Sequence, residues 1–462
     1  MINLIDKSKN IFFLGIKGVA MANLAVILKK MGKQVYGVDL KEEFITDKLL
    51  KENQIDYQFN FSDLPGNIDL FVYSAAHQGI NNPLSKKAQK KGIKIISQTQ
   101  LIGDLMKKFD VKIAVSGCHG KTTTSSLLAY SLIKLNQKPS YLVGVPYFND
   151  YPGGDFQEKK YFVVEADEYG VNPPIDITPK FFYLQPDWII ATNIDFDHPD
   201  VYKNIEETKR AFLKFFDNKK LILNIDDENL SDVYKKLKNK KNIFTYGFSD
   251  QADFQIINWQ VNENGSSLTI KNLGEFKINL FGKHNVLNAT AVILQLVKLG
   301  FNIDEIKKSL LGFLGAKRRL ELVYQGNFYL VDDYAHHPKE IEATLRAVKQ
   351  RFENRRVIVI FQPHTFSRTL SLLSDFRKSL ELADIGLILP IFASARENKD
   401  QFKISAKDIV GKSKKLIYCQ DKIELINQLK QIIKKNDVII TMGAGDVYQL
   451  KDEIVKLKKV IK

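Results

Sequence analysis

The sequence contains little cysteine and no long apolar run. Cys118 and Cys419 are the only cysteines in 462 residues. Two cysteines are too few for a disulfide framework, so we expect a reducing compartment, the cytoplasm. No run of about 18 uncharged apolar residues occurs, so the sequence offers no transmembrane-helix candidate and predicts no membrane partner. The first residues, Met1–Asp6, do not combine a basic segment with an apolar stretch, and we expect no secretory signal.

Positive charge is in excess, but it lacks the pattern of a nucleic-acid-binding protein. The formal net charge is +15. Lysines are scattered in pairs such as Lys29-Lys30 and Lys414-Lys415, and aromatic residues do not alternate with them. We interpret the charge as a solvated, lysine-rich surface that favours anionic substrates, and we expect no nucleic-acid partner. A basic P-loop nucleic-acid ATPase is the more distant alternative.

Length and periodicity predict an α/β protein of three domains. Residues 1–108 alternate strands and helices as in a Rossmann-like parallel sheet. Residues 109–314 are a P-loop ATPase-like α/β domain with an antiparallel part around the turn at Asn264-Gly265. Residues 315–462 return to a Rossmann-like α/β pattern. The expected strands are 11–14, 34–39, 70–74, 93–97, 112–116, 161–164, 188–192, 328–331, 357–361, 385–389 and 438–441, and the expected helices are 20–31, 122–135 and 285–299.

An incomplete phosphate-loop motif follows the first strand of the middle domain. Gly120-Lys121-Thr122 matches the end of G-x-x-x-x-G-K-[ST], but Val115 stands at the first glycine, and Gly117 lies three residues before Gly120. A helix that begins after such a loop presents N–H groups to a phosphate, and Lys121 adds a positive charge. The Thr122 hydroxyl is a suitable Mg²⁺ ligand. We therefore interpret the segment as a nucleotide-binding loop instead of an ordinary turn.

Two acidic segments follow other strands of the same domain. Glu165-Ala166-Asp167-Glu168 comes directly after a buried strand, and crowded carboxylates repel one another unless a cation offsets them. His198 lies in the segment 193–200, after another strand. Because ligands gather at the carboxyl ends of parallel strands, these side chains predict a Mg²⁺ site beside the phosphate loop. A solvated acidic loop and a turn-capping histidine are the alternatives.

Several motifs in order resemble the Mur ligase family of peptidoglycan biosynthesis, and the resemblance covers nearly the whole chain. They are 117–124, 165–168, 193–198, 282–289, Arg318-Arg319, 332–338 and 361–369. The resemblance implies a uridine-nucleotide domain, a central ATPase and an amino-acid domain. It also implies a reaction in which ATP phosphorylates a carboxylate and an amine then attacks the acyl phosphate.

The resemblance implies ATP and Mg²⁺ as cofactors and assigns residues to them. ATP contacts are expected from Gly117, Cys118, His119, Gly120, Lys121, Thr122, Thr123, His284, Asn285, Asn288, Arg319 and Asp333. Magnesium ligands are expected at Thr122, Glu165 and His198. The catalytic group is expected to be Lys121, Glu165, His198, Arg319 and Asp333. A solvated helix position for Asn288 and a surface charge for Arg319 are the alternatives.

The resemblance also assigns the two other substrates. The UDP-sugar is expected at Gly15, Ile16, Lys17, Gly18 and Val19 with Asp39 and Ser74, although Lys17 and Ala20 depart from the glycine-richer form usual in the family member that adds L-alanine. A simple glycine turn is the alternative. The amino acid is expected at His337, His364 and Arg368, and each of these two histidines has turn capping as its alternative.

Features within the family divide between two members. The segments 361–369, 393–397 and 443–446 resemble the member that adds L-alanine to UDP-N-acetylmuramate. The long segment 169–185 and Ala335 resemble the member that returns murein tripeptide to the same nucleotide. We predict L-alanine addition, by a monomer or homodimer, with tripeptide ligation as the alternative. A folate–glutamate ligase is disfavoured because the nucleotide domain looks complete.

Overall fold

The computed structural model describes residues 4–262, 264–393, 397 and 399–459. The chain forms two compact units. The first comprises the residues up to Trp259 together with Leu268–Ile278 and Leu287–Leu314, and the second comprises Gln260–Ser267, Asn279–Val286 and the residues from Gly315 onwards. The domain boundaries at 108 and 314 stay predictions. Among the described residues, no helix has the length and apolar character needed to cross a membrane.

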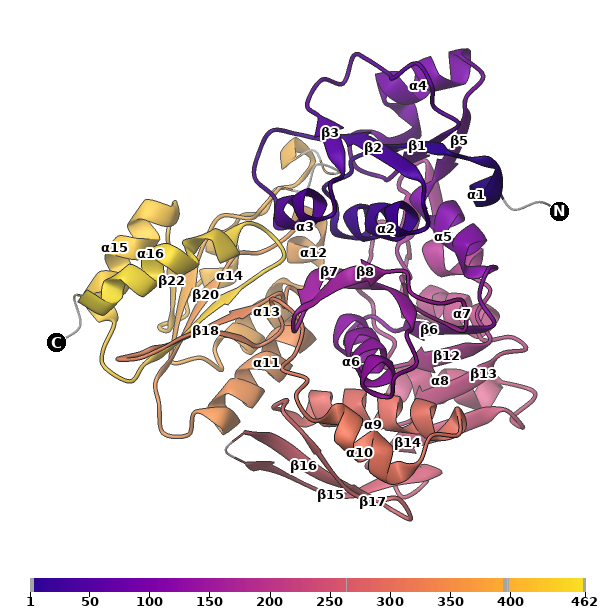
Figure 1. Cartoon of the computed structure of the whole chain (residues 1–462). Helices are drawn as coiled ribbons and strands as arrows, with labels where there is room; N and C mark the ends of the chain where they lie inside the picture. Colours follow the sequence, from indigo (N-terminus) through magenta and orange to yellow (C-terminus); the bar gives the residue numbers. More distant parts are fainter. Residues whose placement is uncertain (1–3, 263, 394–396, 398, 460–462) are drawn as a thin grey trace. The chain divides into compact units, whose positions relative to one another are not determined.

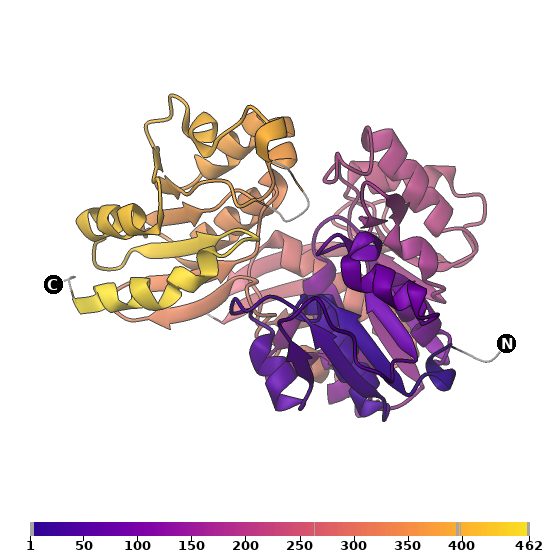
Figure 2. The same cartoon turned by 90° about the horizontal axis from the view of Figure 1, so that it is seen from above.

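The first unit begins with a five-stranded parallel sheet in the order β3-β2-β1-β4-β5. In Figure 2 its indigo strands lie side by side. The expected strands are confirmed, whereas β3 was not expected because its sequence, Asp56-Tyr57-Gln58, is short and polar. The elements are β1 (Asn10–Leu14), β2 (Gln34–Val38), β3 (Asp56–Gln58), β4 (Leu70–Tyr73), β5 (Lys94–Ser97), α1 (Leu4–Lys7), α2 (Val19–Lys30), α3 (Asp47–Glu52), α4 (Pro83–Lys90) and α5 (Gln98–Met106).

Helices cover both faces of this sheet, as Figure 1 shows. Successive strand residues point to opposite faces, so Phe13 packs with α2, α3 and α5 whereas Phe12 packs with α4. Both faces of the strands are therefore apolar, as in a doubly wound parallel sheet. The carboxyl ends of β1, β2 and β4 remain available for a ligand.

A ten-stranded sheet follows, in the order β17-β16-β15-β14-β13-β12-β6-β9-β7-β8. Its strands β6, β9, β12, β13 and β14 pair in parallel, and β7 and β8 pair antiparallel. The stretch expected around Asn264-Gly265 is confirmed as consecutive neighbouring strands, β15 to β17. The strands are β6 (Val111–Ser116), β7 (Ser140–Phe148), β8 (Tyr151–Asp155), β9 (Tyr161–Ala166), β12 (Trp188–Ala191), β13 (Lys220–Asn224), β14 (Ile243–Gly247), β15 (Phe254–Asn262), β16 (Gly265–Ile270) and β17 (Gly274–Ile278).

Helices accompany this sheet, and the expected helices at 122–135 and 285–299 are confirmed. They are α6 (Lys121–Lys134), α7 (Ile205–Phe215), α8 (Glu228–Lys236), α9 (Lys283–Lys298) and α10 (Ile303–Leu310). Helix α9 ends before Gly300, which adopts a left-handed φ of 90°. This conformation is the usual one for a glycine that stops a helix.

The second unit holds a six-stranded sheet in the order β18-β19-β23-β20-β21-β22, and only the β18 and β19 pair is antiparallel. Its central strand β20, Val-Ile-Val-Ile-Phe, is completely buried. The elements are β18 (Glu321–Gln325), β19 (Tyr329–Asp333), β20 (Val357–Phe361), β21 (Ile385–Ile388), β22 (Leu416–Tyr418), β23 (Val438–Met442), α11 (Pro338–Arg351), α12 (Phe366–Ser371), α13 (Leu373–Leu380), α14 (Ala406–Val410), α15 (Lys422–Ile432) and α16 (Lys451–Lys456). The α/β fold expected from the sequence is confirmed.

Helix α2 connects the two sheets of the first unit through one buried asparagine. The Asn23 carboxamide donates to the Val143 carbonyl at 2.8 Å and to the Val145 carbonyl at 2.9 Å. Both carbonyls belong to β7, whose pairing with β8 shifts register between Leu142 and Tyr147. Asn23 thus supplies donors to carbonyls at an irregular part of the sheet.

We predict that Asn23→Ala destabilises the first unit by about 2–4 kcal/mol, because two buried carbonyls lose their donors. Calorimetry should show a thermal midpoint lower by roughly 5 °C or more. Asn239→Ala removes an exposed asparagine and is the control. Equal midpoints for the two variants would contradict the role of Asn23.

Candidate functional site

Three segments predicted to carry chemistry lie at one edge of the central sheet. The strands β12, β6 and β9 are neighbours and run parallel. The phosphate loop follows β6, Glu165 lies near the end of β9, and the segment 193–198 follows β12. Parallel strands bring their carboxyl ends to the same edge, so these segments converge although His119 and Asn193 are 74 residues apart in the chain.

The phosphate loop needs glycine at two positions. Gly117 has φ 126° and Gly120 has φ 83°, and both values favour glycine. A Cβ at Gly117 would lie 2.2 Å from the Thr192 hydroxyl, and one at Gly120 would lie 2.7 Å from the Asn288 side chain. Asn288 is buried beside the loop, which disagrees with a solvated helix position and agrees with its predicted ATP contact.

Lys121 forms a buried ion pair at the start of α6. Its ammonium nitrogen lies 2.7 Å from Glu168 Oε2 and donates to the Gly117 carbonyl at 2.6 Å. Only 1% of the Glu168 side chain is exposed. Burial by itself would lower the pKa of Lys121, but Glu168 and Asp167 outweigh it and raise this pKa. Lys121 is therefore a permanent cation in the loop.

Glu165 is held beside the Thr122 hydroxyl by several donors. Thr122 Oγ1 lies 3.3 Å from Glu165 Oε2, and the Ser125 hydroxyl donates to Oε1 at 3.1 Å. The Gly144 N–H also donates to Oε1. Hydroxyl and carboxylate oxygens at this separation suit Mg²⁺, which prefers oxygen ligands about 2.1 Å away. The predicted ligands Thr122 and Glu165 thus fit the ion.

A second group of possible ligands consists of Asp167, Glu168 and His198, whose ligand atoms lie within 4.8 Å of one another. His198 Nε2 is 3.6 Å from Glu168 Oε1. Burial would raise the pKa of Asp167, but Lys180, Lys121 and His198 lower it, so this carboxylate is ionised. The site therefore offers charged oxygens near the predicted His198 ligand.

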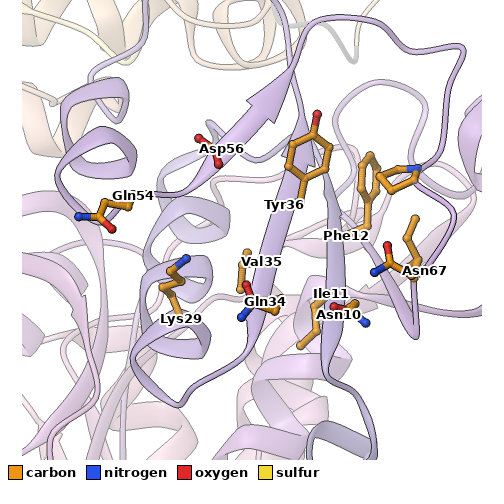
Figure 3. A pocket seen from close by; sticks show the side chains of 12 residues that line it. Asn10, Ile11, Phe12, Lys29, Gln34, Val35, Tyr36, Gln54, Asp56 and Asn67 are labelled. Atoms are coloured by element: carbon orange, nitrogen blue, oxygen red, sulfur yellow. The ribbon is translucent and has the colours of Figure 1, made fainter.

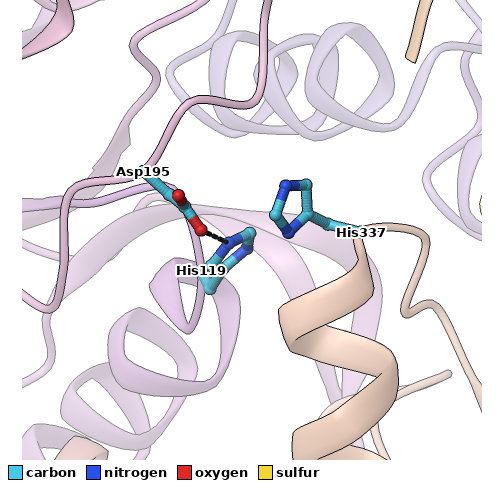
Figure 4. Close-up of side chains that lie close together, drawn as sticks. All are labelled: His119, Asp195 and His337. Carbon is cyan, nitrogen blue, oxygen red and sulfur yellow. Dashed lines mark hydrogen bonds and ion pairs between the residues drawn. The ribbon is translucent and has the colours of Figure 1, made fainter. Parts of the chain in front are cut away.

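Side-chain contacts fasten the phosphate loop to the segment after β12. Asn193 Oδ1 accepts from the His119 N–H at 2.9 Å, and His119 Nε2 lies 3.3 Å from Asp195 Oδ2, as Figure 4 shows. The Cys118 thiol donates to the Asp195 carbonyl at 3.2 Å. Burial is the main cause that raises the pKa of Cys118, so its thiol stays protonated and packs as a neutral group.

The predicted UDP-sugar residues meet at the carboxyl edge of the first sheet. Gly15 has φ 82°, and a Cβ there would lie 3.2 Å from the Ser74 hydroxyl and 3.3 Å from the His77 ring. Asp39 accepts from the Lys17 N–H at 2.7 Å and lies 3.0 Å from His77 Nε2. Gly15, Asp39 and Ser74 are thus brought together, and His77 joins them.

The Lys17 ammonium has a protein environment of its own. It donates to the Glu42 carbonyl at 3.0 Å and lies 3.2 Å from Asp47 Oδ1. The rings of Phe44, Tyr57 and Phe59 surround it at 5.1–5.3 Å. With only 1% of its side chain exposed, the ammonium stabilises the segment after β2 through cation–π and ionic contacts. The Lys17 ammonium therefore points into the protein and not to solvent, although Lys17 is predicted to contact the UDP-sugar.

A pocket of about 480 Å³ opens at the other end of the first sheet, and Figure 3 shows it. It is lined from the amino ends of β1, β2 and β3, including Asn10, Gln34 and Asp56, and from residues 65–68. None of the predicted site residues lines it. The pocket is therefore separate from the predicted UDP-sugar site.

In the second unit, the two neighbouring arginines differ. Arg318 lies 3.2 Å from the buried Asp332 and donates to the Gly443 carbonyl at 2.6 Å. Arg319 Nη1 lies 3.9 Å from Glu340 and keeps 24% of its side chain exposed. The geometry thus gives Arg318 a structural partner and leaves Arg319 accessible for its predicted ATP contact.

Asp333 is buried and His284 is half-buried, and both have shifted pKa values. Burial raises the pKa of Asp333 to about 6, although Arg319 and the N–H groups of Ala335 and Leu320 oppose the shift. Burial lowers the pKa of His284 to about 4. Asn285, also predicted to contact ATP, donates to the Phe281 carbonyl at 2.9 Å. His284 is thus neutral at pH 7.

Two of the predicted amino-acid residues follow strands β19 and β20 of the second sheet, which lie on either side of β23. His337 follows β19 and is the N-cap of α11, where its Nδ1 accepts from the Lys339 N–H at 3.4 Å; Figure 4 shows it at the start of this helix. His364 follows β20, and its ring lies 5.9 Å from that of Phe392. Arg368 is buried on α12. His337 thus caps the helix through Nδ1, and the amino-acid pocket stays a prediction. Residues 394–396 lie outside the described residues; they belong to the segment 393–397, which resembles the alanine-adding member in sequence.

Sequence reasoning missed Asn193, Ser125 and His77 as members of these sites. Asn193 lay inside a recognised motif, and its place directly after a buried strand was the available signal. Ser125 is one turn after Lys121 on α6, so helical spacing could have found it. His77 has a left-handed φ of 53°, and nothing in its sequence surroundings predicts this conformation.

We predict that Lys121→Met destabilises the first unit by about 3–5 kcal/mol, because Glu168 is left buried without its cation. Adding Glu168→Gln removes that charge and should recover most of the loss. Thermal unfolding without ligands measures both effects. Lys138→Met, at an exposed pair with Glu158, is the control and should change little. A Lys121→Met midpoint equal to the parent's would refute the importance of the ion pair.

We predict opposite pH effects for His284→Gln and Asp333→Asn. The raised pKa of Asp333 adds stability below its unfolded value of 3.8, and this stability is lost as the pH rises through about 6. The lowered pKa of His284 adds stability above 6.5, and it is lost as the pH falls through about 4. Each contribution is about 3 kcal/mol, and the two cancel in the parent protein.

Relative to the parent, His284→Gln should therefore gain stability as the pH falls from 7 to 4.5, and Asp333→Asn should gain it as the pH rises. Thermal midpoints of the three proteins at four pH values measure these differences. Midpoint differences that do not vary with pH would show that neither group titrates as its burial requires.

Family comparisons cover almost the whole chain. Residues 10–110 match the Mur ligase family catalytic domain, residues 115–296 the Mur ligase middle domain, and residues 318–445 the Mur ligase glutamate ligase domain. UDP-N-acetylmuramate–L-alanine ligase of Lactobacillus acidophilus is 38% identical over 98% of this chain and 100% of its own length. The enzyme of that name from Caldanaerobacter subterraneus is 37% identical over 98% and 99%.

Solved structures of two ligases are also similar to this chain. The UDP-N-acetylmuramate–alanine ligase of Thermotoga maritima is 26% identical, with a TM-score of 0.80 over 97% of this chain and 99% of its own. A murein peptide ligase of Psychrobacter arcticus, 23% identical with a TM-score of 0.75 over 97% and 98%, shares the fold. With its phosphate loop, carboxylates and three sheets in the family's order, the chain belongs to the Mur ligase family.

Proposed function

We propose that the protein ligates L-alanine to the carboxylate of UDP-N-acetylmuramate, with ATP as phosphoryl donor, in peptidoglycan precursor synthesis. The observation that carries the choice of substrates is the 37–38% identity, over nearly the full chain, to enzymes of that name. The geometry supports the ATP half of the reaction, because Lys121, Thr122 and Glu165 meet at one sheet edge.

The chemistry requires a cation-rich site. A carboxylate is a poor electrophile until one of its oxygens becomes a leaving group, and phosphorylation achieves this. Two anions must approach each other in that step, so fixed positive charge has to offset their repulsion. Lys121 supplies such a charge, and the N–H groups at the start of α6 add their dipole. Mg²⁺, held by Thr122 and Glu165 with His198 at a second ion, would offset further phosphate charge.

Lys121 changes partner when a phosphate binds. Without ligand its ammonium neutralises Glu168 at 2.7 Å. A nucleotide phosphate brings more negative charge than one carboxylate and therefore competes for the same ammonium. Lys180, 2.8 Å from Asp167, remains as a cation beside the two carboxylates, and His198 lies 3.6 Å from Glu168.

The remaining assignments follow the three parts of the chain. Residues 1–108 bind the UDP-sugar with Gly15, Asp39 and Ser74. Residues 109–314 bind ATP, and residues 315–462 bind L-alanine with His337, His364 and Arg368 while Arg319 and Asp333 reach ATP. The enzyme acts in the cytoplasm, as a monomer or homodimer, on soluble small molecules.

Ligation of murein tripeptide to the same nucleotide is the second candidate. The segment 169–185, which resembles the tripeptide-adding member in sequence, folds into its own hairpin. Both candidates share the nucleotide and ATP, so the amine substrate separates them.

We predict that phosphate release from ATP and Mg²⁺ requires UDP-N-acetylmuramate and L-alanine together. The double variant Lys121→Met/Glu168→Gln should fold and release phosphate at least about 100-fold more slowly, because the phosphates lose their fixed cation. A coupled phosphate assay measures both. Release that requires tripeptide in place of L-alanine would support the second candidate, and release that requires only DNA or RNA would refute both.

A further inference from the structure

The segment 169–185 forms a short hairpin that bridges the two predicted sites of the first unit. Strand β10 (Gly170–Asn172) pairs antiparallel with β11 (Asp176–Pro179), and a 3₁₀ turn, η2 (Lys180–Tyr183), follows. The β10 residues are buried, whereas Ile175 and Ile177 are more than half exposed. No site residue was predicted in this segment.

The base of the hairpin is attached to the carboxylates beside the phosphate loop. Lys180 Nζ lies 2.8 Å from Asp167 Oδ2, and the Phe181 N–H donates to the Asp167 carbonyl at 3.1 Å. The Phe181 ring is completely buried and stacks on Phe215 at 4.4 Å. These contacts fix the hairpin's orientation relative to Lys121 and Glu168.

The other end of the hairpin packs against the loop that follows β4. A Cβ at Gly79 would lie 2.8 Å from Asn172 Oδ1 and 2.9 Å from its Nδ2. Gly79 is two residues beyond His77, which itself approaches Gly15. A Cβ at Gly103 on α5 would lie 2.3 Å from the Tyr183 carbonyl. Asn172 thus packs against the segment that follows the predicted UDP-sugar residue Ser74.

Asn172 carries an unmet hydrogen bond at this contact. Its side chain is 3% exposed, and among the described residues its Nδ2 has no acceptor. A buried amide without a partner costs free energy, and such groups in native proteins call for an explanation. A rotation of the amide by 180° exchanges its nitrogen and oxygen. A ligand that both donates and accepts satisfies either orientation.

The chemistry of the proposed substrate supplies such a group. Its diphosphate end belongs at Gly15 and Ser74, and its carboxylate end belongs at Lys121 and Glu165. In UDP-N-acetylmuramate the sugar lies between the diphosphate and the carboxylate. The hairpin contacts Gly79, near the first end, and Asp167, near the second. Sugar hydroxyl and acetamido groups both donate and accept hydrogen bonds.

Resting on the proposed function, we propose that the Asn172 carboxamide binds the sugar of UDP-N-acetylmuramate and that the hairpin 169–185 is a wall of the sugar site. Asn172 is then a specificity-determining residue, and Lys180 and Phe181 hold it in place. The length of the segment thereby has a function in recognising the nucleotide sugar.

The test is Asn172→Val, which suits a strand and removes the amide. The unmet group disappears, so the ligand-free thermal midpoint should equal or exceed the parent's. The KM for UDP-N-acetylmuramate should rise about 3- to 10-fold, the effect of one neutral hydrogen bond, while the KM values for ATP and L-alanine stay unchanged. The thermal shift caused by UDP alone, which lacks the sugar, should also stay unchanged.

Ile257→Val, an exposed change on β15 outside the hairpin, is the control and should leave all three KM values unchanged. Asn172→Ala provides a second variant if Asn172→Val does not fold. An unchanged KM for the UDP-sugar would overturn the assignment, and so would a lowered midpoint with all KM values raised together. A parent protein without UDP-N-acetylmuramate-dependent turnover would instead refute the proposed function.

Discussion

The buried ion pair between Lys121 and Glu168 is the interaction on which the phosphate site depends. It places a cation at the start of α6 and neutralises a carboxylate with 1% of its side chain exposed. Taking both charges out of water is costly, and the attraction between them repays that cost only while both are present. The surrounding polar contacts follow from this constraint: Lys180 pairs with Asp167, His198 lies beside Glu168, and the Gly117 carbonyl accepts from Lys121. The arrangement is stable without ligand and holds a positive charge ready for a phosphate.

Local sequence patterns were sufficient to predict which segments meet at this edge of the sheet. A buried strand, two glycines and a helix define the loop, and parallel pairing of β12, β6 and β9 then brings Glu165 and His198 to it. These are short-range patterns and a general rule of sheet topology. Short-range patterns do not predict which side chains from distant strands and helices contact the loop. Asn288 contacts Gly120 because α9 packs there, and the spacing of 168 residues between them carries no local signal.

The first sheet shows that the type of a residue does not determine where its side chain points. Lys17 sits in a glycine-containing turn, where a charge suggests a ligand contact, yet its side chain enters a cage of Phe44, Tyr57 and Phe59 closed by Asp47. Aromatic rings and a carboxylate distributed over 15 residues or so stabilise that ammonium better than solvent does. His337 likewise caps α11. Asn172 is the converse case, since an inconspicuous asparagine in an unassigned segment has the unmet hydrogen bond.

The proposed reaction forms an acyl phosphate at the sheet edge where Lys121 and Glu165 lie. Its most direct test is isotope transfer from UDP-N-acetylmuramate labelled with ¹⁸O in the carboxylate. If ATP phosphorylates that carboxylate before L-alanine attacks, one ¹⁸O atom appears in each released phosphate, which mass spectrometry or ³¹P NMR detects. Phosphate that carries no label from the carboxylate would mean that ATP is hydrolysed without activating the substrate, and it would contradict the account.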